Sequence, residues 1–243
     1  MQPNILIVIL LAAFILSCGI EENYFLPQVP EAYISRELNS DAMLIIPSID
    51  QYYYALNYTI FYKIYISGHS TSGAIQSAEE WRSISQDIAT DYDVIFPSTD
   101  PTSTTTTAIN TLFKNRNFFE LELDGADIRE LLPTSGSTMR LHFPAAPGYL
   151  PVANINGREF SLRRSSELIS PEPDMFFRNS TELSDITKAN SNINADVAVR
   201  SGIAIPYAYV SMYIVAIGLN PVGFTQIYSK PTHISIFRLP DIN

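Results

Sequence analysis

The chain is poor in cysteine and in basic side chains, and it has no apolar run long enough to cross a bilayer as a helix. Its single cysteine, Cys18, excludes an intrachain disulfide and any motif built on a cysteine pair. Lys and Arg number 15 against 25 Asp and Glu, which leaves a net charge of −10. Because affinity for the phosphate backbone comes mainly from clustered basic residues, we exclude nucleic acid as a partner.

The sequence also lacks the short motifs that usually identify an enzyme or a nucleotide-binding protein. It contains no G-x-S-x-G, G-x-x-x-x-G-K-[ST], G-x-G-x-x-G or H-E-x-x-H pattern. Its three histidines, His69, His142 and His233, are too widely spaced to form a local metal motif. We therefore predict no catalytic residue, no metal ligand and no cofactor.

The longest apolar run, Ile5–Leu16, has the length of a signal-peptide core, whereas a membrane-spanning helix needs about 20 apolar residues. Cys18 follows this run after one small residue. The segment Ile15–Gly19 resembles a bacterial lipobox, in which the leader is cut before the cysteine and the cysteine receives acyl chains such as palmitate. This resemblance implies a lipoprotein signal peptide over 1–17, lipidation of Cys18 and attachment to a membrane of the cell envelope. One departure is that residues 1–4 contain no Lys or Arg.

The remainder of the chain suits a single large domain. Residues 18–41, with scattered Pro and Glu, predict a lipidated tether between the membrane and the domain. Residues 42–243 then predict one domain with a large insertion around 97–200. Fourteen Tyr and thirteen Phe favour a β-rich fold.

Several segments alternate with the period of two that is typical of a sheet. Tyr58–Ile66 is the clearest, and Tyr207–Leu219 with Pro231–Leu239 predicts a long antiparallel hairpin. Shorter strands are predicted at 42–46, 118–124, 139–143 and 159–164. Helices are predicted near 77–88, 108–113 and 126–132. A long polar loop is predicted between 170 and 194.

Two stretches near the carboxyl end resemble the final strands of a fibronectin type III or immunoglobulin-like domain. Met212–Ala216 is similar to the family's Val-x-Val-x-Ala pattern, and Ser229–Pro231 to its Ser-x-Pro entry into the last strand. The resemblance implies a mainly β, antiparallel sandwich, here with helical and loop insertions. Val210 departs from it, because it occupies the place of the family's corner tyrosine. Residues 227–240 also resemble spirochaete envelope lipoproteins of unknown role, which implies an exported domain with no assigned activity.

Three consecutive tyrosines, Tyr52, Tyr53 and Tyr54, are candidates for partner binding. They adjoin the predicted strand at 58, and tyrosines in the loops of a sandwich provide contact area at low entropic cost. We predict that they contact a protein or a glycan, with packing beneath the loop as the alternative.

Glu120, Glu122 and Asp124 alternate with leucines, so they are predicted to project from one face of a strand. Such a row can supply the acid and base of glycoside hydrolysis. The alternative is a solvated face whose charges protect a sheet edge from aggregation, and we favour it. The prediction is therefore a non-catalytic binding or structural module of the envelope, and the alternative is an envelope enzyme that acts on glycans through paired carboxylates.

Mass spectrometry of the protein purified from its native membrane tests the lipid anchor. We expect an amino terminus at Cys18 and a mass raised by acyl chains. The Cys18→Ser variant should lose this mass and leave the membrane fraction, because each buried methylene contributes about 0.8 kcal/mol to membrane binding. An intact Met1 together with an unmodified Cys18 sulfur would contradict the anchor.

Overall fold

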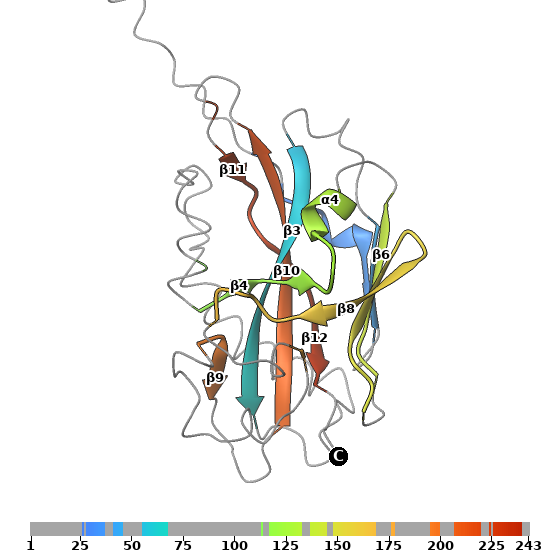
Figure 1. Cartoon of the computed structure of the whole chain (residues 1–243). Helices are drawn as coiled ribbons and strands as arrows, with labels where there is room; N and C mark the ends of the chain where they lie inside the picture. Colours follow the sequence, from blue (N-terminus) through green and yellow to red (C-terminus); the bar gives the residue numbers. More distant parts are fainter. Residues whose placement is uncertain are drawn as a thin grey trace, which may run out of the picture.

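The computed structural model describes residues 26, 28–36, 41–45, 55–67, 113, 117–132, 137–144, 148–168, 176–177, 195–199, 207–219, 224 and 226–239. Strands predominate among them and form two sheets that pack face to face (Figure 1). The described helices are one 3-10 turn, η1 (Glu31–Tyr33), and one short α-helix, α4 (Ile128–Leu131). The mainly β, antiparallel sandwich predicted from the sequence is thus confirmed, whereas the immunoglobulin or fibronectin III arrangement stays a prediction.

The first sheet has six strands, all paired antiparallel. Their order is β1 (Ile34–Arg36), β2 (Asp41–Ile45), β6 (Thr138–His142), β7 (Val152–Ile155), β8 (Arg158–Arg163) and β5 (Glu122–Leu123).

The second sheet is built around two strands of thirteen residues, β3 and β10, which pair antiparallel over almost their whole length. β11 and β12 both pair with the free edge of β10, while β4 and β9 pair with the free edge of β3. The β3–β9 pair is the one parallel pair among the described strands. The bounds are β3 (Ala55–Ser67), β4 (Phe119–Glu120), β9 (Val197–Val199), β10 (Tyr207–Leu219), β11 (Gln226–Tyr228) and β12 (Thr232–Arg238).

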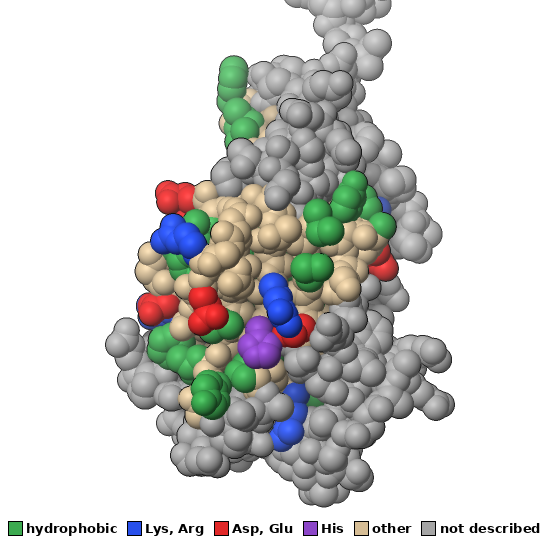
Figure 2. Space-filling model, turned by 90° about the vertical axis from the view of Figure 1, so that its right-hand side faces the viewer, with side chains coloured by type: hydrophobic (Ala, Val, Ile, Leu, Met, Phe, Trp, Pro, Cys, Tyr) green, Lys and Arg blue, Asp and Glu red, His purple; other side chains and the backbone are tan. Residues whose placement is uncertain are grey.

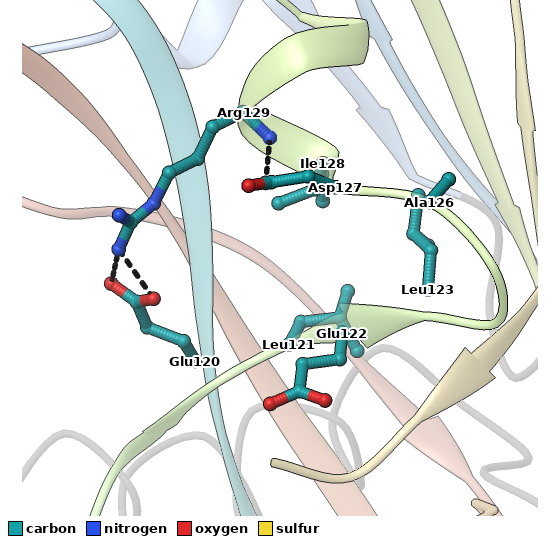
Figure 3. Close-up of a pocket in the computed structure, with 8 residues that line it drawn as sticks. All are labelled: Glu120, Leu121, Glu122, Leu123, Ala126, Asp127, Ile128 and Arg129. Atoms are coloured by element: carbon teal, nitrogen blue, oxygen red, sulfur yellow. Dashed lines mark hydrogen bonds and ion pairs between the residues drawn. The ribbon is translucent and has the colours of Figure 1, made fainter. Parts of the chain in front are cut away.

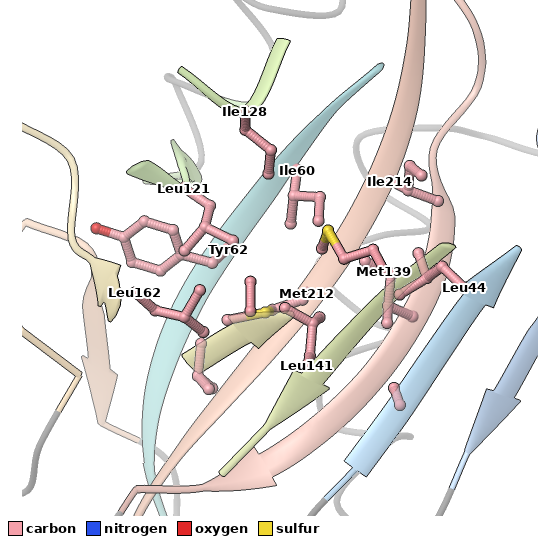
Figure 4. Close-up of a cluster of buried hydrophobic side chains, with 14 of the residues drawn as sticks. Leu44, Ile60, Tyr62, Leu121, Ile128, Met139, Leu141, Leu162, Met212 and Ile214 are labelled. Carbon is pink, nitrogen blue, oxygen red and sulfur yellow. The ribbon is translucent and has the colours of Figure 1, made fainter. Parts of the chain in front are cut away.

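The core lies between the sheets and follows the alternation of the strands. Ile60 and Tyr62 of β3 and Met212 and Ile214 of β10 point inward, toward the side chains of the first sheet (Figure 4). The facing residues of that sheet, Leu44, Met139, Leu141 and Leu162, are all buried. Burial of such side chains away from water is the main favourable term in folding.

The outer face of the second sheet is buried as well. Phe61, Tyr65, Tyr209 and Tyr213 alternate with the inward-facing residues and form a second apolar cluster. Phe113 stacks on Phe61 with ring centroids 4.3 Å apart. Stacked aromatic pairs of this kind add to the stability that burial itself provides. This burial explains why most residues on both faces of β3 and β10 are apolar or aromatic in sequence.

Residues 97–200, predicted as an insertion, supply several strands of the sandwich. β6, β7 and β8 form the middle of the first sheet, and β4 and β5 lie one residue apart in different sheets. Leu121 occupies the crossing point, where it is buried and its N–H donates to the carbonyl of Ile60. The segment from 118 to 124 therefore closes one edge of the sandwich by passing from one sheet to the other.

Part of the predicted tether, residues 18–41, is also packed on the domain. Leu26 and Val29 are buried in the main core, and β1 pairs with β2. The Gln28 amide donates to the Pro231 carbonyl at 2.8 Å, and the Thr232 hydroxyl donates to the Val29 carbonyl. The folded domain therefore begins before residue 42.

The predicted hairpin near the carboxyl end is present, but its second strand is interrupted. Ser229, Lys230 and Pro231 separate β11 from β12, and proline has no N–H to donate to the ladder. Ser229 compensates for the interruption, because its side-chain oxygen accepts from the N–H of Ala216 and its own N–H donates to the Ala216 carbonyl, both at 2.9 Å.

The predicted helix over 126–132 corresponds to α4, which spans Ile128–Leu131. Asp127 caps it, because its carboxylate accepts from the Arg129 N–H at 2.8 Å. Asp124, three residues before Asp127, pairs with Arg163 instead. The predicted helix at 77–88 lies outside the described residues. Of the predicted helix at 108–113 only Phe113 is described, and of the predicted loop at 170–194 only Phe176 and Phe177 are described.

A buried ion pair joins the two sheets. Arg164 directly follows β8, Asp196 directly precedes β9, and their side chains are 1% and 0% exposed. The guanidinium donates to both carboxylate oxygens, with one Nε–Oδ2 distance of 2.8 Å. Burial lowers the pKa of Arg164, but the Asp196 carboxylate outweighs it and raises that pKa overall. Nearby, burial and then the Asp196 charge raise the pKa of the Tyr62 phenol, whose oxygen accepts from the Ser165 N–H.

Removing one partner of this pair should be costly, because the other charge stays buried without compensation. We expect Arg164→Met to lower the free energy of unfolding by about 3–5 kcal/mol, measured by urea denaturation. The double variant Arg164→Met with Asp196→Leu should recover most of the loss, since it removes both buried charges. Arg158→Met, at an exposed position of β8, is the control and should change the stability by less than about 1 kcal/mol. Equal losses in the single and double variants would contradict a buried-charge penalty.

Candidate functional site

The predicted contact residues Tyr52, Tyr53 and Tyr54 lie outside the described residues, as do Cys18 and His69. The predicted carboxylates are described. Within the part of the chain that the structure describes, no helix is both long and apolar enough to cross a membrane. In the same residues, no three His, Cys, Asp or Glu side chains come together as a metal site.

The carboxylates of Glu120, Glu122 and Asp124 do not form one continuous row. Glu120 belongs to β4 in the second sheet, whereas Glu122 belongs to β5 in the first, and Asp124 follows the end of β5. The alternation in sequence correctly indicates extended backbone at these residues. It cannot show that the chain changes sheets at Leu121, and the prediction of a single strand face is therefore wrong.

Each of the three carboxylates has its own partner. Glu120 accepts from the Arg129 guanidinium with both oxygens, each at 2.5 Å. Burial lowers the pKa of Arg129, but Glu120 outweighs it and raises that pKa overall. Glu122 accepts from the N–H and the hydroxyl of Ser166, both at 2.7 Å.

Glu120, Glu122 and Arg129 line a crevice of about 370 Å³ between α4 and the β4–β5 segment. Figure 3 shows Arg129 reaching down from α4 to Glu120, while the Glu122 carboxylate points away from Arg129. Glycoside hydrolysis needs two carboxyl groups that share one substrate, one as acid and one as base or nucleophile. Here Glu120 is paired with Arg129, whereas Glu122 is hydrogen-bonded to Ser166. The two carboxyl groups therefore have separate partners and are not arranged around one shared substrate position.

A second polar group lies on the outer face of the first sheet. Asp41 on β2 stands opposite His142 on β6, and Arg140 lies two residues before His142 on the same face. The Asp41 carboxylate contacts His142 Nδ1 with one oxygen and Arg140 Nη2 with the other, each at 2.5 Å. In Figure 2, which faces this side of the molecule, a histidine lies against basic and acidic side chains.

The exposure of these three side chains differs in a way that suits binding. The Asp41 side chain is 11% exposed, whereas Arg140 and His142 are 58% and 44% exposed. A carboxylate can only accept, so Nδ1 of His142 donates to Asp41, and this hydrogen bond fixes the orientation of the ring. Asp41 therefore acts as a positioning residue for two exposed polar side chains.

These side chains border a hollow of about 440 Å³ on the same face. Its lining combines Arg140 and His142 with Val152 and Asn154 of β7 and Glu159 of β8. The strand register brings them together, because Arg140 pairs with Asn154, and Asn154 pairs with Glu159. A guanidinium, an imidazole, an amide and a carboxylate provide donors and acceptors for a polar ligand.

His233 lies elsewhere, on the covered face of the second sheet. Its Nε2 is 3.2 Å from the hydroxyl of Ser211, which is fully buried, and its ring lies 5.0 Å from that of Tyr213. We therefore place the candidate site at the hollow beside His142 rather than at His233.

The sequence alone does not reveal this site, although part of its signal is present. Thr138, Arg140 and His142 alternate with the apolar residues of a predicted strand, so they are expected on its solvent face. The contact of Arg140 and His142 with Asp41, about a hundred residues earlier, follows from the register of β2 and β6. One sequence does not specify that register.

Comparison of the chain with models of protein families, with curated proteins and with solved structures finds no match. The candidate site therefore depends on the geometry of this chain alone.

The environment of Asp41 predicts how stability depends on pH. Partial burial raises the pKa of Asp41, but hydrogen bonds from Arg140 and His142 and their charges outweigh it and lower the pKa below its ordinary value. A carboxylate with a lowered pKa in the folded state stabilises the protein above its unfolded pKa, and this contribution is lost as the pH falls through the folded pKa.

We expect Asp41→Asn to lower the free energy of unfolding by about 1 kcal/mol at pH 7. The difference from the wild type should begin to shrink as the pH falls below about 4, the ordinary pKa of Asp, and should disappear only below the lower pKa of the folded state. Urea denaturation at a series of pH values measures this difference. Asp124→Asn is the control, because Asp124 is 53% exposed and its pair with Arg163 is longer, at 3.2 Å. A loss that is the same at pH 7 and pH 3 would contradict the ionic origin.

Proposed function

We propose that this protein is an exported lipoprotein, anchored through Cys18, whose β-sandwich is a non-catalytic binding module of the bacterial cell envelope. The anchor is supported by the twelve-residue apolar run that ends next to the single cysteine. The lipid attaches the module either to the outer membrane or to a membrane surface that faces the periplasm. Its partner is a protein or a glycan.

One observation carries the binding part of this proposal: Asp41 holds Arg140 and His142 on an open face of the sheet. Polar side chains that are already held in place lose less entropy when a ligand binds, which improves affinity. The hollow beside them offers both donors and acceptors around one apolar residue, Val152. A polar ligand such as a sugar or a polar peptide segment fits this chemistry.

The partners of the carboxylates argue against the alternative, an enzyme that acts on glycans. Glu120 is held by Arg129, and Glu122 is held by Ser166. Neither glutamate is left to act on a substrate together with the other. We therefore propose a structural role for this segment, in which the ion pair and hydrogen bonds fix α4 and the end of β8 to the strand crossing.

Tyr52, Tyr53 and Tyr54 remain a proposed second contact. They directly precede β3, so the chain itself brings them to the start of that strand. Tyr53→Ala and Tyr54→Ala variants that capture every partner of the wild type would remove these residues from the proposal.

Site-specific cross-linking in the native membrane tests the binding face. If Cys18 is acylated, Asn154→Cys introduces the only free thiol in the chain, and a photoreactive maleimide can be attached there. We expect a discrete cross-linked partner from position 154. Arg140→Ala and His142→Ala should reduce its yield severalfold while the protein stays in the membrane fraction.

Glu130→Cys provides the matched control, because Glu130 is exposed on α4, outside the lining of the hollow. Equal cross-linking from positions 130 and 154 would contradict the binding face. Release of sugars from envelope glycans that is lost in Glu122→Gln would instead support the enzyme.

A further inference from the structure

We infer that the end of the second sheet formed by the start of β3 and the β10–β11 turn rests on the surface of the lipid bilayer, with Leu56 and Phe224 in contact with lipid. This inference rests on the proposed lipid anchor at Cys18. It adds an orientation, in which one end of the sandwich is a membrane contact and the side face of the first sheet stays open.

Two exposed apolar side chains lie at this end. The pairing of Ala55 with Gly218 and of Asn57 with Ile217 sets Leu56 beside the end of β10. Phe224 lies in the turn just beyond that end, two residues before β11 begins. Leu56 is 53% exposed and Phe224 is 76% exposed, although Phe is usually among the most buried residue types.

The backbone at Phe224 is a separate sign of function. Its φ of 51° lies in the left-handed region, which a bulky residue rarely adopts. Strained backbone of this kind concentrates at functional positions. Here the strained residue is the most exposed large hydrophobic residue described. A water-facing turn would be served as well by a polar residue or glycine, so presentation of the aromatic ring is the feature that needs an explanation.

The same end of the sheet carries no charge in sequence. Residues 51–62 and 208–229 contain no Asp, Glu, Lys or Arg, although the chain has a net charge of −10. The first charged residue after this second range is a cation, Lys230. Bacterial membranes present anionic headgroups, which repel carboxylates and attract Lys and Arg. The strand segments of this end bring no carboxylate of their own, so they avoid this repulsion although the net charge of the protein is negative.

The amino-terminal segment is attached to the second sheet nearer to this end than to the other. Gln28 and Val29 are held at Pro231 and Thr232, and Thr232 pairs with Ile214 of β10. Five residues separate Ile214 from the β11 end of β10, about 17 Å, and seven separate it from the other end, about 23 Å. The segment is therefore attached nearer to the end that carries Phe224.

The length of the chain before this attachment limits how far the domain can stand from the membrane. Leu26 is buried in the core, and only eight residue steps separate it from Cys18, which span at most about 28 Å. The second sheet itself is about 43 Å long, because its central strands have thirteen residues. The anchor therefore holds the sandwich against the bilayer and not at a distance from it.

Fluorescence quenching by lipid tests this contact. The full lipidated protein with Phe224→Cys or Leu56→Cys is labelled with an environment-sensitive dye and reconstituted into vesicles of phosphatidylcholine and phosphatidylglycerol. We expect emission from both positions to shift to shorter wavelength and to lose most of its intensity when the vesicles contain nitroxide-labelled lipid. Tyr149→Cys is the matched control, because Tyr149 is an aromatic residue with 67% exposure in the connection between β6 and β7 of the other sheet. Its emission should change little.

The remaining outcomes separate this inference from the proposed function. If the protein floats with the vesicles but the dyes at 224 and 56 are quenched no more than the dye at 149, the anchor stands and the contact is wrong. If those dyes shift to shorter wavelength without quenching, a protein surface such as a second copy covers this end, which also overturns the lipid contact. If unlabelled wild type carries no acyl mass and fails to float, the proposed function fails, and the inference fails with it.

Discussion

β3 and β10 pair from Tyr207 opposite Ser67 to Gly218 opposite Ala55, and both faces of this ladder are buried. All the other strands of the second sheet pair with one of these two. The inner face provides the apolar surface on which the first sheet packs, and the outer face holds the aromatic cluster around Phe61 and Phe113. The position of the exposed end follows from this pair, because Leu56 lies at the start of β3 and Phe224 lies just beyond the end of β10.

The strands of the second sheet could be predicted because their sequence pattern is long and regular. Tyr58–Ile66 and Tyr207–Leu219 lie within observed strands of thirteen residues, and the predicted return strand from Pro231 corresponds to β12. The strands of the first sheet are shorter, and several of them lie within the predicted insertion. Alternation shows that such a segment is extended, but it does not show which sheet it joins, as the passage of the chain through Leu121 demonstrates.

The candidate site was predictable only in part, for the same reason. Arg140 and His142 lie on the solvent side of a predicted strand, but their shared partner Asp41 is brought to them by the register. Arg164 is similar, because it continues the inward alternation of Phe160 and Leu162 beyond the end of β8. That pattern places a charge toward the core, and a buried guanidinium requires an acceptor. The identity of the acceptor, Asp196, depends on long-range packing.

The attachment of residues 26–29 to the β11–β12 break has a mechanical consequence. A force that pulls the amino terminus away from the domain loads the Gln28 and Thr232 hydrogen bonds and the buried Leu26 and Val29 side chains first. These contacts meet the chain where Ser229 and Pro231 already interrupt the ladder. Tension on the amino terminus would thus detach residues 26–29 first, while the long central strands keep their pairing.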